Sequence, residues 1–408
     1  MRVCLIWVAV ASAACVKSVV PEYELRRDDA LATADVPARW TPDAVLMLSP
    51  NIIDNIVHDG IEERGTFKRK IELAGSRHHV SPSLSITELD VLPGGSCPSC
   101  FTLHAALQGS LTWRIGGSAG EMPLSGDIVF EVSFQARRDT DGWLVEARPR
   151  SVQKARISLD NKTYRTVRVM AQSALDDWAA KHAFDAFEPI VLKRFDDDGL
   201  PVLAVRPVRT DNGLRLDLLT AATVHELVDE PIIRPDEDWA LQVSQRALLA
   251  EVRRAAFAHG PVSHGVHLEP LAIDIKEGTF TLDLRLWRLK GRGWWRDVRI
   301  HGSHLHTSKG VELRALDVDE VGQSKGAALV DPLAALAEGQ ILKAIEHSMQ
   351  TVLPDDRVTA VGDRSIQTKI TRFSGRSRTL RVGGTLSVDR ISRKEKRPVP
   401  SRVGDDNR

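Results

Sequence analysis

The chain has 408 residues, of which 42% are hydrophobic and 27% are charged, a balance typical of globular domains. This length suits two domains of ordinary size, each large enough to bury its own core. Lysine plus arginine and aspartate plus glutamate both number 55, so the chain lacks the net basic field that favours nucleic acid, and we expect no nucleic-acid partner.

The first predicted element is a signal peptide. An apolar run over residues 3–14 follows Met1 and Arg2. The run is too short to span a bilayer core of about 30 Å but suits a secretory signal. We therefore expect residues 1–15 to direct export.

Cys15 decides what holds the exported protein in place. Residues 12–15 resemble a bacterial lipobox, in which the cysteine is lipidated, although Ser12 stands where leucine or valine is usual. Acyl chains contribute roughly 0.8 kcal/mol per buried CH₂, so we predict an outer-membrane lipoprotein that faces the periplasm or the cell surface. Residues 11–13 also satisfy the small-x-small rule of ordinary signal peptidase, and cleavage there would release a soluble periplasmic or secreted protein.

A tether and the start of a first domain follow. Residues 16–40 carry prolines among polar residues, a composition typical of a tether. The first domain, expected over residues 41–218, opens with a short apolar strand that stops at Ser49. The hydroxyl of this serine can accept a hydrogen bond from the first turn of a helix, and Pro50 suits the first helical position.

Cys97 and Cys100 form a C-x-x-C pair. A redox-active pair places its first cysteine at a helix N-terminus after a strand, whereas here glycines precede it and a strand begins at Phe101. In the oxidising compartment that export implies, we predict a local disulfide that clamps a turn. Its short loop implies about 2 kcal/mol of stabilisation.

Long alternating strands follow, joined at residues 116–120. Apolar residues share one face of each strand and polar residues the other, which is typical of antiparallel sheets with one wet face. Ser118 completes a G-x-S-x-G pattern, but hydrolase chemistry needs that serine at a strand-to-helix elbow. With strands on both sides, a hairpin turn is the better interpretation. Helical spacing predicts a long helix between about residues 163 and 184.

The second half of the chain repeats the first. Residues 219–237 are the expected linker, residues 238–392 the second domain and residues 393–408 a disordered tail. Several matches in the same order indicate a tandem duplication. The matched pairs of segments are 43–49 with 238–244, 101–104 with 280–283, and 202–205 with 358–361. A second long helix is expected at about residues 332–353.

A basic and aromatic hairpin tip is predicted within residues 287–296. Two glycines there mark a turn that places Arg292, Trp294 and Trp295 near the tip. Aromatic rings with cations suit a membrane interface. The alternative is that the tryptophans pack on the domain's own helix.

His301, His304 and His306 are the densest group of imidazoles. In an extended strand the last two project from one face and His301 from the other, so convergence on a metal would require a bulge. The acidic turn at residues 196–199 lacks the ligand spacing of an EF-hand loop. We expect no metal and no cofactor.

The duplicated order of strand, serine, helix, long meander, long helix and closing strands resembles the tubular lipid-binding (TULIP) superfamily, which includes bactericidal/permeability-increasing protein. The resemblance covers nearly all of residues 43–392 and rests on topology and duplication. It implies an α+β fold of two tandem domains, each a long twisted antiparallel sheet wrapped on two helices, with an apolar groove for acyl chains. Binding residues are not carried over, because the lipid contacts of the family are apolar and unspecific in sequence.

These features predict an exported, non-enzymatic protein of the bacterial envelope that binds or transfers lipid acyl chains and meets the membrane through its anchor. The alternative is a structural or assembly lipoprotein with a fully packed core, and an enzyme is the third possibility. No catalytic residues are expected. The residues expected to line the grooves lie on the apolar faces of the helices and strands: Ile53, Val57, Leu103, Leu107, Leu111, Phe130, Phe134, Leu248, Val252, Phe280, Leu282 and Leu284.

Overall fold

The structure is a computed structural model. It describes residues 18–32, 36–62, 67–68, 71–72, 79–115, 117–140, 142–159, 168–169, 171–173, 176, 189–196, 201–220, 228–262, 265–307, 310–324, 356–361, 364–376 and 378–390. Cys15, the expected tail and the expected helix at 332–353 lie outside these ranges. So does most of the expected helix at 163–184, of which residues 168–169, 171–173 and 176 are described, all of them helical.

The order of elements repeats, as the duplication predicts. In the first domain it is β1 (Ala44–Leu48), α3 (Pro50–Glu62), β2 (Phe67–Lys68), β3 (Ile71–Glu72), β4 (His79–Pro93), β5 (Cys100–Ile115), β6 (Ser118–Asp139), β7 (Gly142–Leu159), β8 (Ile190–Asp196), β9 (Val202–Thr210) and β10 (Gly213–Thr220). In the second domain it is β11 (Trp239–Ser244), α5 (Gln245–His259), β12 (Val266–Lys276), β13 (Thr279–Arg288), β14 (Trp294–Thr307), β15 (Gly310–Gln323), β16 (Asp356–Val361), β17 (Arg364–Arg376) and β18 (Thr379–Arg390).

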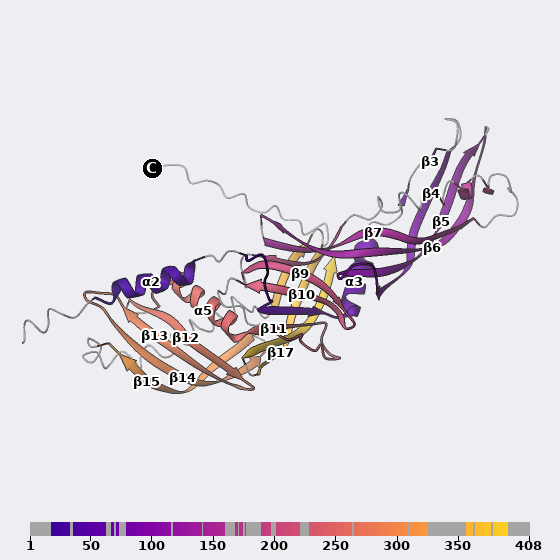
Figure 1. Cartoon of the computed structure of the whole chain (residues 1–408). Helices are drawn as coiled ribbons and strands as arrows, with labels where there is room; N and C mark the ends of the chain where they lie inside the picture. The colour runs from indigo at the N-terminus through magenta and orange to yellow at the C-terminus, as the bar shows by residue number, and fades with distance from the viewer. Residues whose placement is uncertain are drawn as a thin grey trace, which may run out of the picture.

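Within the described ranges the strands form three antiparallel sheets. One sheet belongs to the first domain in the order β2-β4-β5-β6-β7-β8, with β3 also on β4, and one to the second in the order β12-β13-β14-β15. The third has the order β16-β17-β18-β11-β1-β10-β9 and draws strands from both domains. Figure 1 shows this shared sheet in the middle of an elongated molecule, with the other two sheets at opposite ends. The predicted α+β fold of two tandem domains, each with a long antiparallel sheet, is confirmed.

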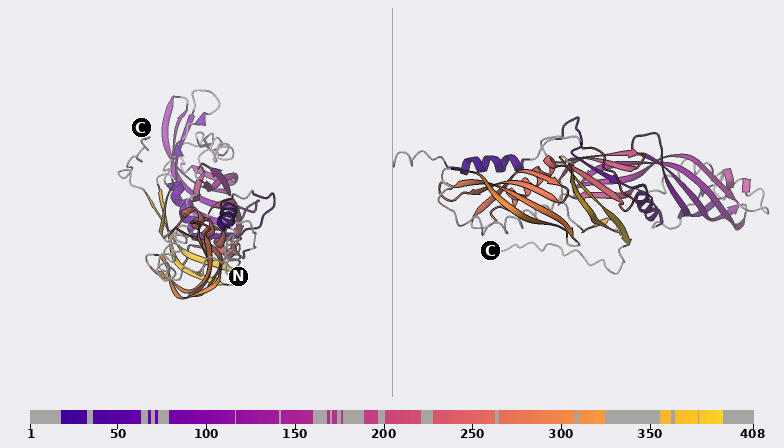
Figure 2. Two further views of the ribbon diagram at one scale, coloured as in Figure 1. Left: turned by 90° about the vertical axis from the view of Figure 1, so that its left-hand side faces the viewer. Right: turned by 90° about the horizontal axis from the view of Figure 1, so that it is seen from below.

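Buried apolar residues alternate with exposed polar residues along the long strands. Along β5, Phe101, Leu103 and Leu107 are buried while His104 and Gln108 are exposed. One face of the sheet therefore meets the interior and the other meets solvent. The left view of Figure 2 looks along the molecule and shows that the sheet of the second domain is curled rather than flat.

The two domains meet where β1 pairs with β11. The strands run antiparallel with Leu46 opposite Leu241, two residues that also occupy equivalent positions in the repeat. A pair of equivalent residues at the centre of an antiparallel contact is the signature of a two-fold relation.

Hydrogen bonds at the joint follow the same two-fold relation. The Ser49 N–H donates to the carbonyl oxygen of Asp238 at 2.9 Å, and the Ser244 N–H donates to the carbonyl oxygen of Asp43 at 2.9 Å. Ser49 and Ser244 are equivalent residues of the repeat, and so are Asp43 and Asp238, so the two hydrogen bonds are equivalent and run in opposite directions across the joint. The joint is reciprocal at the level of single atoms.

Both predicted serine caps are present. The Ser49 hydroxyl accepts a hydrogen bond from the Ile52 N–H at 3.3 Å, and the Ser244 hydroxyl accepts one from the Ala247 N–H at 3.0 Å. Each cap satisfies an N–H of the first helical turn that has no partner within the helix. The serines therefore stop each strand and start each helix.

One predicted segment match is wrong. The sequence pairs residues 202–205 with residues 358–361, which would make β9 the counterpart of β16. In the structure β9 lies beside β10, which pairs with β1, and β17 lies beside β18, which pairs with β11. The counterpart of β9 is therefore β17. Short Val-x-Ala-Val segments recur because buried strands share a composition.

Residues 20–31 form a helix where the sequence predicts only tether. This helix, α2 (Val20–Leu31), lies beside α5 along the second domain (Figures 1 and 2). Its Tyr23 is 3% exposed, with its ring centroid 5.6 Å from that of Phe257 and 5.8 Å from that of Trp287. The Tyr23 hydroxyl is 2.9 Å from Nδ1 of His267. The segment is thus part of the second domain.

Candidate functional site

The inner faces of α3 and α5 are apolar and buried. Ile53 and Val57 on α3, and Leu248 and Val252 on α5, are all 1% exposed or less. Each pair is spaced by one helical turn, which puts both residues on one face. The two helices therefore present the predicted residues to the interior.

The sheets present the other predicted residues to the same interior. Leu103, Leu107, Leu111, Phe130 and Phe134 of the first domain are buried, and Phe134 meets Phe101 edge to face at a centroid distance of 5.0 Å. In the second domain the buried residues are Phe280, Leu282 and Leu284.

All twelve predicted groove-lining residues belong to one buried apolar cluster, which runs through both domains. Each is 5% exposed or less. The structure thus brings the predicted residues together, across the joint as well as within each domain. Their contact with a lipid stays a prediction.

Glu251 is a charged residue on this inner surface that the sequence analysis missed. It lies on α5 between Leu248 and Val252 and is 3% exposed. Its Oε2 is 3.9 Å from Nε of Arg254, and its Oε1 accepts no hydrogen bond from any described residue. The register of the repeat could have revealed it, because the equivalent residue of α3 is Ile56.

Burial shifts the protonation of this carboxyl. Loss of solvation raises the pKa of Glu251 to about 7, with Arg254 acting to lower it and Asp43 to raise it. Near neutral pH the group is therefore poised between its charged and neutral forms, inside an apolar surface.

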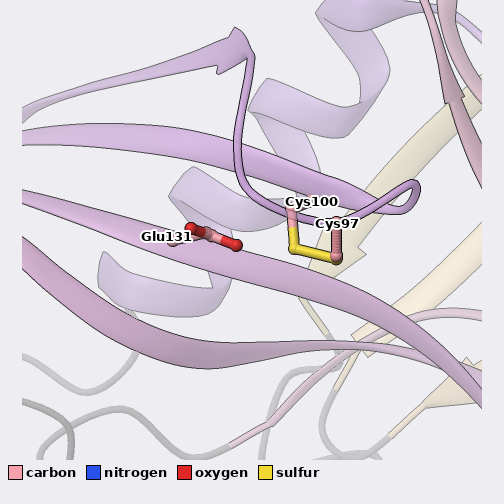
Figure 3. A group of neighbouring side chains, drawn as sticks. All are labelled: Cys97, Cys100 and Glu131. Atoms are coloured by element: carbon pink, nitrogen blue, oxygen red, sulfur yellow. A yellow bond between two sulfur atoms is a disulfide. The ribbon is translucent and has the colours of Figure 1, made fainter.

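Cys97 and Cys100 form the predicted disulfide. Their sulfur atoms are 2.00 Å apart, and Figure 3 shows the bond beside Glu131 of the neighbouring strand. The Glu131 carboxylate accepts hydrogen bonds from the N–H (3.2 Å) and the hydroxyl (2.8 Å) of Ser96, and it is 3.7 Å from Nη1 of Arg150. The cysteines and Glu131 are close enough to share a metal ion, but sulfurs joined to each other are not the thiolates that bind metals. The cluster is a clamp for the turn before β5.

The predicted hairpin tip lies between β13 and β14, and its two tryptophans are partly buried against the second domain. The carbonyl oxygen of exposed Arg292 accepts a hydrogen bond from the Val19 N–H at 3.1 Å. Trp294 packs on the main apolar cluster, and Trp295 packs beside Val19. The Arg285 guanidinium lies 4.1 Å from the centroid of the Trp295 ring. This is the packing of the alternative interpretation, and contact of the tip with a membrane stays a prediction.

Ser118 lies in a hairpin, as predicted. It is the first residue of β6 and pairs with Ile115, the last residue of β5. With a strand on each side, its exposed hydroxyl has neither the elbow nor the helix that hydrolase chemistry requires.

The histidines of β14 have separate neighbours. His301 Nε2 is 3.8 Å from the Asp319 carboxylate, whereas His304 Nε2 is 2.8 Å from the carbonyl oxygen of Lys276. These two rings therefore do not converge on one point. The side chain of His306 lies outside the described residues.

Among the described helices, none combines the length and the apolar character needed to cross a bilayer.

Comparisons with known proteins find likeness at the level of structure. No protein-family model matches the chain, and no curated protein matches it. Among solved structures, a lipopolysaccharide binding protein is similar over 86% of this chain and 100% of its own, at 10% identity and a TM-score of 0.36. P47 of Clostridium botulinum E1 is similar over 85% of this chain and 100% of its own (10% identity, TM-score 0.40). P47 of Clostridium botulinum A2 is similar over 84% and 97% (9% identity, TM-score 0.38).

Proposed function

We propose that this protein binds lipids by holding acyl chains in the interior of its two domains. The observation that carries the proposal is the apolar cluster, which both domains build from equivalent helices and strands and which continues across their joint. Each domain sets an amphipathic helix against the inner face of a long antiparallel sheet, the arrangement implied by the resemblance to tubular lipid-binding proteins.

Apolar burial alone can supply the affinity. An acyl chain of about fifteen carbons, at ~0.8 kcal/mol for each CH₂ removed from water, releases on the order of 10 kcal/mol before the cost of ordering the chain. Such binding requires no catalytic group, and we propose no enzymatic activity.

Export and anchoring complete the proposal. The apolar run of residues 3–14 and the lipobox-like segment that ends at Cys15 support a lipoprotein of the bacterial envelope. Because α2 begins at Val20 and packs on the second domain, lipid on Cys15 would hold the second domain, rather than the first, next to the membrane.

A second candidate function is structural or assembly work in the envelope with a fully packed interior. The low exposure of all twelve apolar residues favours it, because the lining of a filled groove and a solid core use the same side chains.

Native mass spectrometry of the chain without residues 1–15 tests the proposal. We expect lipid in stoichiometric amount, released by organic extraction, and uptake of a photoreactive fatty acid by the stripped protein. Cross-links should fall on the inner face of both β5 and β13, at positions such as Leu103 and Leu282. An empty protein that takes up no fatty acid would leave the structural role as the better conclusion.

A further inference from the structure

We propose that Glu251 and Arg254 form a recognition point inside the second domain for a hydroxyl or amide group carried by an acyl chain. The inference deepens the proposed lipid binding and rests on it. It assigns the two domains different ligand preferences: plain chains in the first, and chains bearing such a polar group in the second.

The placement of Glu251 is exceptional within the repeat. The inner faces of α3 and α5 use equivalent positions, and all eight side chains are buried: Ile52, Ile53, Ile56 and Val57 in the first domain, and Ala247, Leu248, Glu251 and Val252 in the second. Seven of these residues are apolar. Glu251 therefore shares the buried face of α5 with the residues to which the proposal assigns the acyl chain.

The unfilled hydrogen-bonding capacity points to the chemistry of the ligand. Glu251 Oε1 is a buried acceptor and Arg254 Nε a buried donor, and neither has a hydrogen-bond partner among the described residues. The distance between Arg254 Nε and Glu251 Oε2 is 3.9 Å, which is too long for a hydrogen bond between the two side chains. Leaving such groups unsatisfied costs free energy, which a ligand that bonds to both would recover.

A hydroxyl or an amide can bond to both atoms, because each donates one hydrogen bond and accepts another. A methylene does neither. A charged ligand group would be attracted by one member of the pair and repelled by the other, and it would bring a further charge into an apolar interior, which costs free energy. An uncharged donor–acceptor group on an otherwise apolar chain is thus the best match to the pair.

Competition binding tests the inference. The wild-type protein without residues 1–15, stripped of lipid, is loaded with a pyrene-labelled fatty acid. The label is then displaced by stearic acid, by stearic acids hydroxylated at carbon 2, 3 or 12, and by stearamide. We expect at least one hydroxylated acid or the amide to compete about tenfold better than stearic acid, the gain typical of a hydrogen bond to a charged group.

Variants assign that preference to the pair. Glu251→Leu should lose the preference while it binds stearic acid at least as well, and Glu251→Gln, whose amide still donates and accepts, should keep part of it. Ile56→Leu at the equivalent position of the first domain is the matched control and should leave the preference unchanged. Thermal unfolding checks that each variant is folded.

Two outcomes overturn the inference and separate it from the proposed function. If the wild type binds every ligand of the panel alike, or if Glu251→Leu keeps the preference, acyl binding stands and the recognition point does not. If neither the wild type nor the variants take up the pyrene-labelled acid, the proposed function fails and the inference fails with it.

Discussion

At the scale of single residues, Glu251 should make stability depend on pH. Its pKa is raised from 4.5 to about 7 in the folded protein, so the folded state binds a proton that the unfolded state has released. The contribution of Glu251 to the free energy of unfolding is therefore fully present below about pH 4.5. It falls as pH rises toward 7 and stays lowered above that pH. The loss expected from this shift is about 3 kcal/mol. Arg254 and Asp43 are the charged neighbours that act on the group.

Urea unfolding of wild type and Glu251→Leu at pH 5 and pH 8 measures this loss. Between pH 5 and pH 8 the wild type should lose about 2.5 kcal/mol more of its free energy of unfolding than Glu251→Leu does, because the variant has no carboxyl to titrate at this position. Ile56→Leu should follow the wild-type profile. Equal pH dependence in wild type and Glu251→Leu would mean that the carboxyl is not buried as described.

Glu269 should contribute stability as a buried carboxylate paired with two partly exposed arginines. It is 0% exposed and accepts hydrogen bonds from Arg26 (3.1 Å), Arg253 and the indole N–H of Trp287 (2.9 Å). Removing the Glu269 charge leaves two arginines that water can partly solvate and a weakened hydrogen bond to Trp287, so the expected loss is about 1–3 kcal/mol.

Glu269→Gln tests this contribution to stability, because glutamine has nearly the same size and shape as glutamate but carries no charge. We expect a drop in the free energy of unfolding of that size, measured in urea at pH 7. Asp274→Asn on the same strand is the control, because its ion pair with Lys276 is exposed and should contribute less than 1 kcal/mol. Similar losses in both variants would contradict the role assigned to Glu269.

At the scale of elements, α2 should be a stable part of the second domain. Tyr23 fills a space between Phe257 and Trp287, and truncating a buried aromatic residue typically costs about 3–5 kcal/mol. Tyr23→Ala should therefore release the helix and expose Arg26 and Arg27 to trypsin.

Limited proteolysis followed by mass spectrometry measures the release. Cleavage after these arginines should be faster in Tyr23→Ala than in wild type, while cleavage in the shared sheet stays slow. Leu25→Ala, at an exposed position of the same helix, is the control. Rapid cleavage of the wild type at Arg26 would instead show a loose tether.

Elements with a strong internal pattern could be predicted from the sequence. The serine caps, the hairpin at Ser118 and the disulfide each depend on a local spacing, the duplication depends on matched segments in the same order, and all are present. The twelve apolar residues could be placed in the interior because alternation and helical spacing report which face is buried.

What the sequence did not predict depends on contacts between distant segments. α2 carries few apolar residues, and its stability comes from Tyr23 and from ion pairs with residues more than two hundred positions away. The shared sheet was missed because a strand's composition does not say which strand lies beside it. Glu251 was missed because an apolar helix face hides a single polar exception unless the repeats are compared position by position.

At the scale of the whole molecule, the two domains should stay together without the chain that links them. They share a seven-stranded sheet and one apolar cluster, so backbone hydrogen bonds and buried area hold the joint. Cutting at a protease site placed between Thr220 and Val228 should give two fragments that still elute as one species in size-exclusion chromatography. Separate elution in the absence of denaturant would show that the linker, rather than the β1–β11 pairing, holds the domains together.

The reciprocal joint also bears on ancestry. Because β1 and β11 meet through equivalent residues, with Leu46 opposite Leu241, a chain with a single domain could pair with a second copy of itself in the same way. Gene duplication and fusion would then have joined two copies that already formed a homodimer, and the interface between them would have stayed the same. Once the copies were fused, each could accept mutations that the other did not share. The contrast between Ile56 and Glu251 is a difference that no dimer of identical chains could hold.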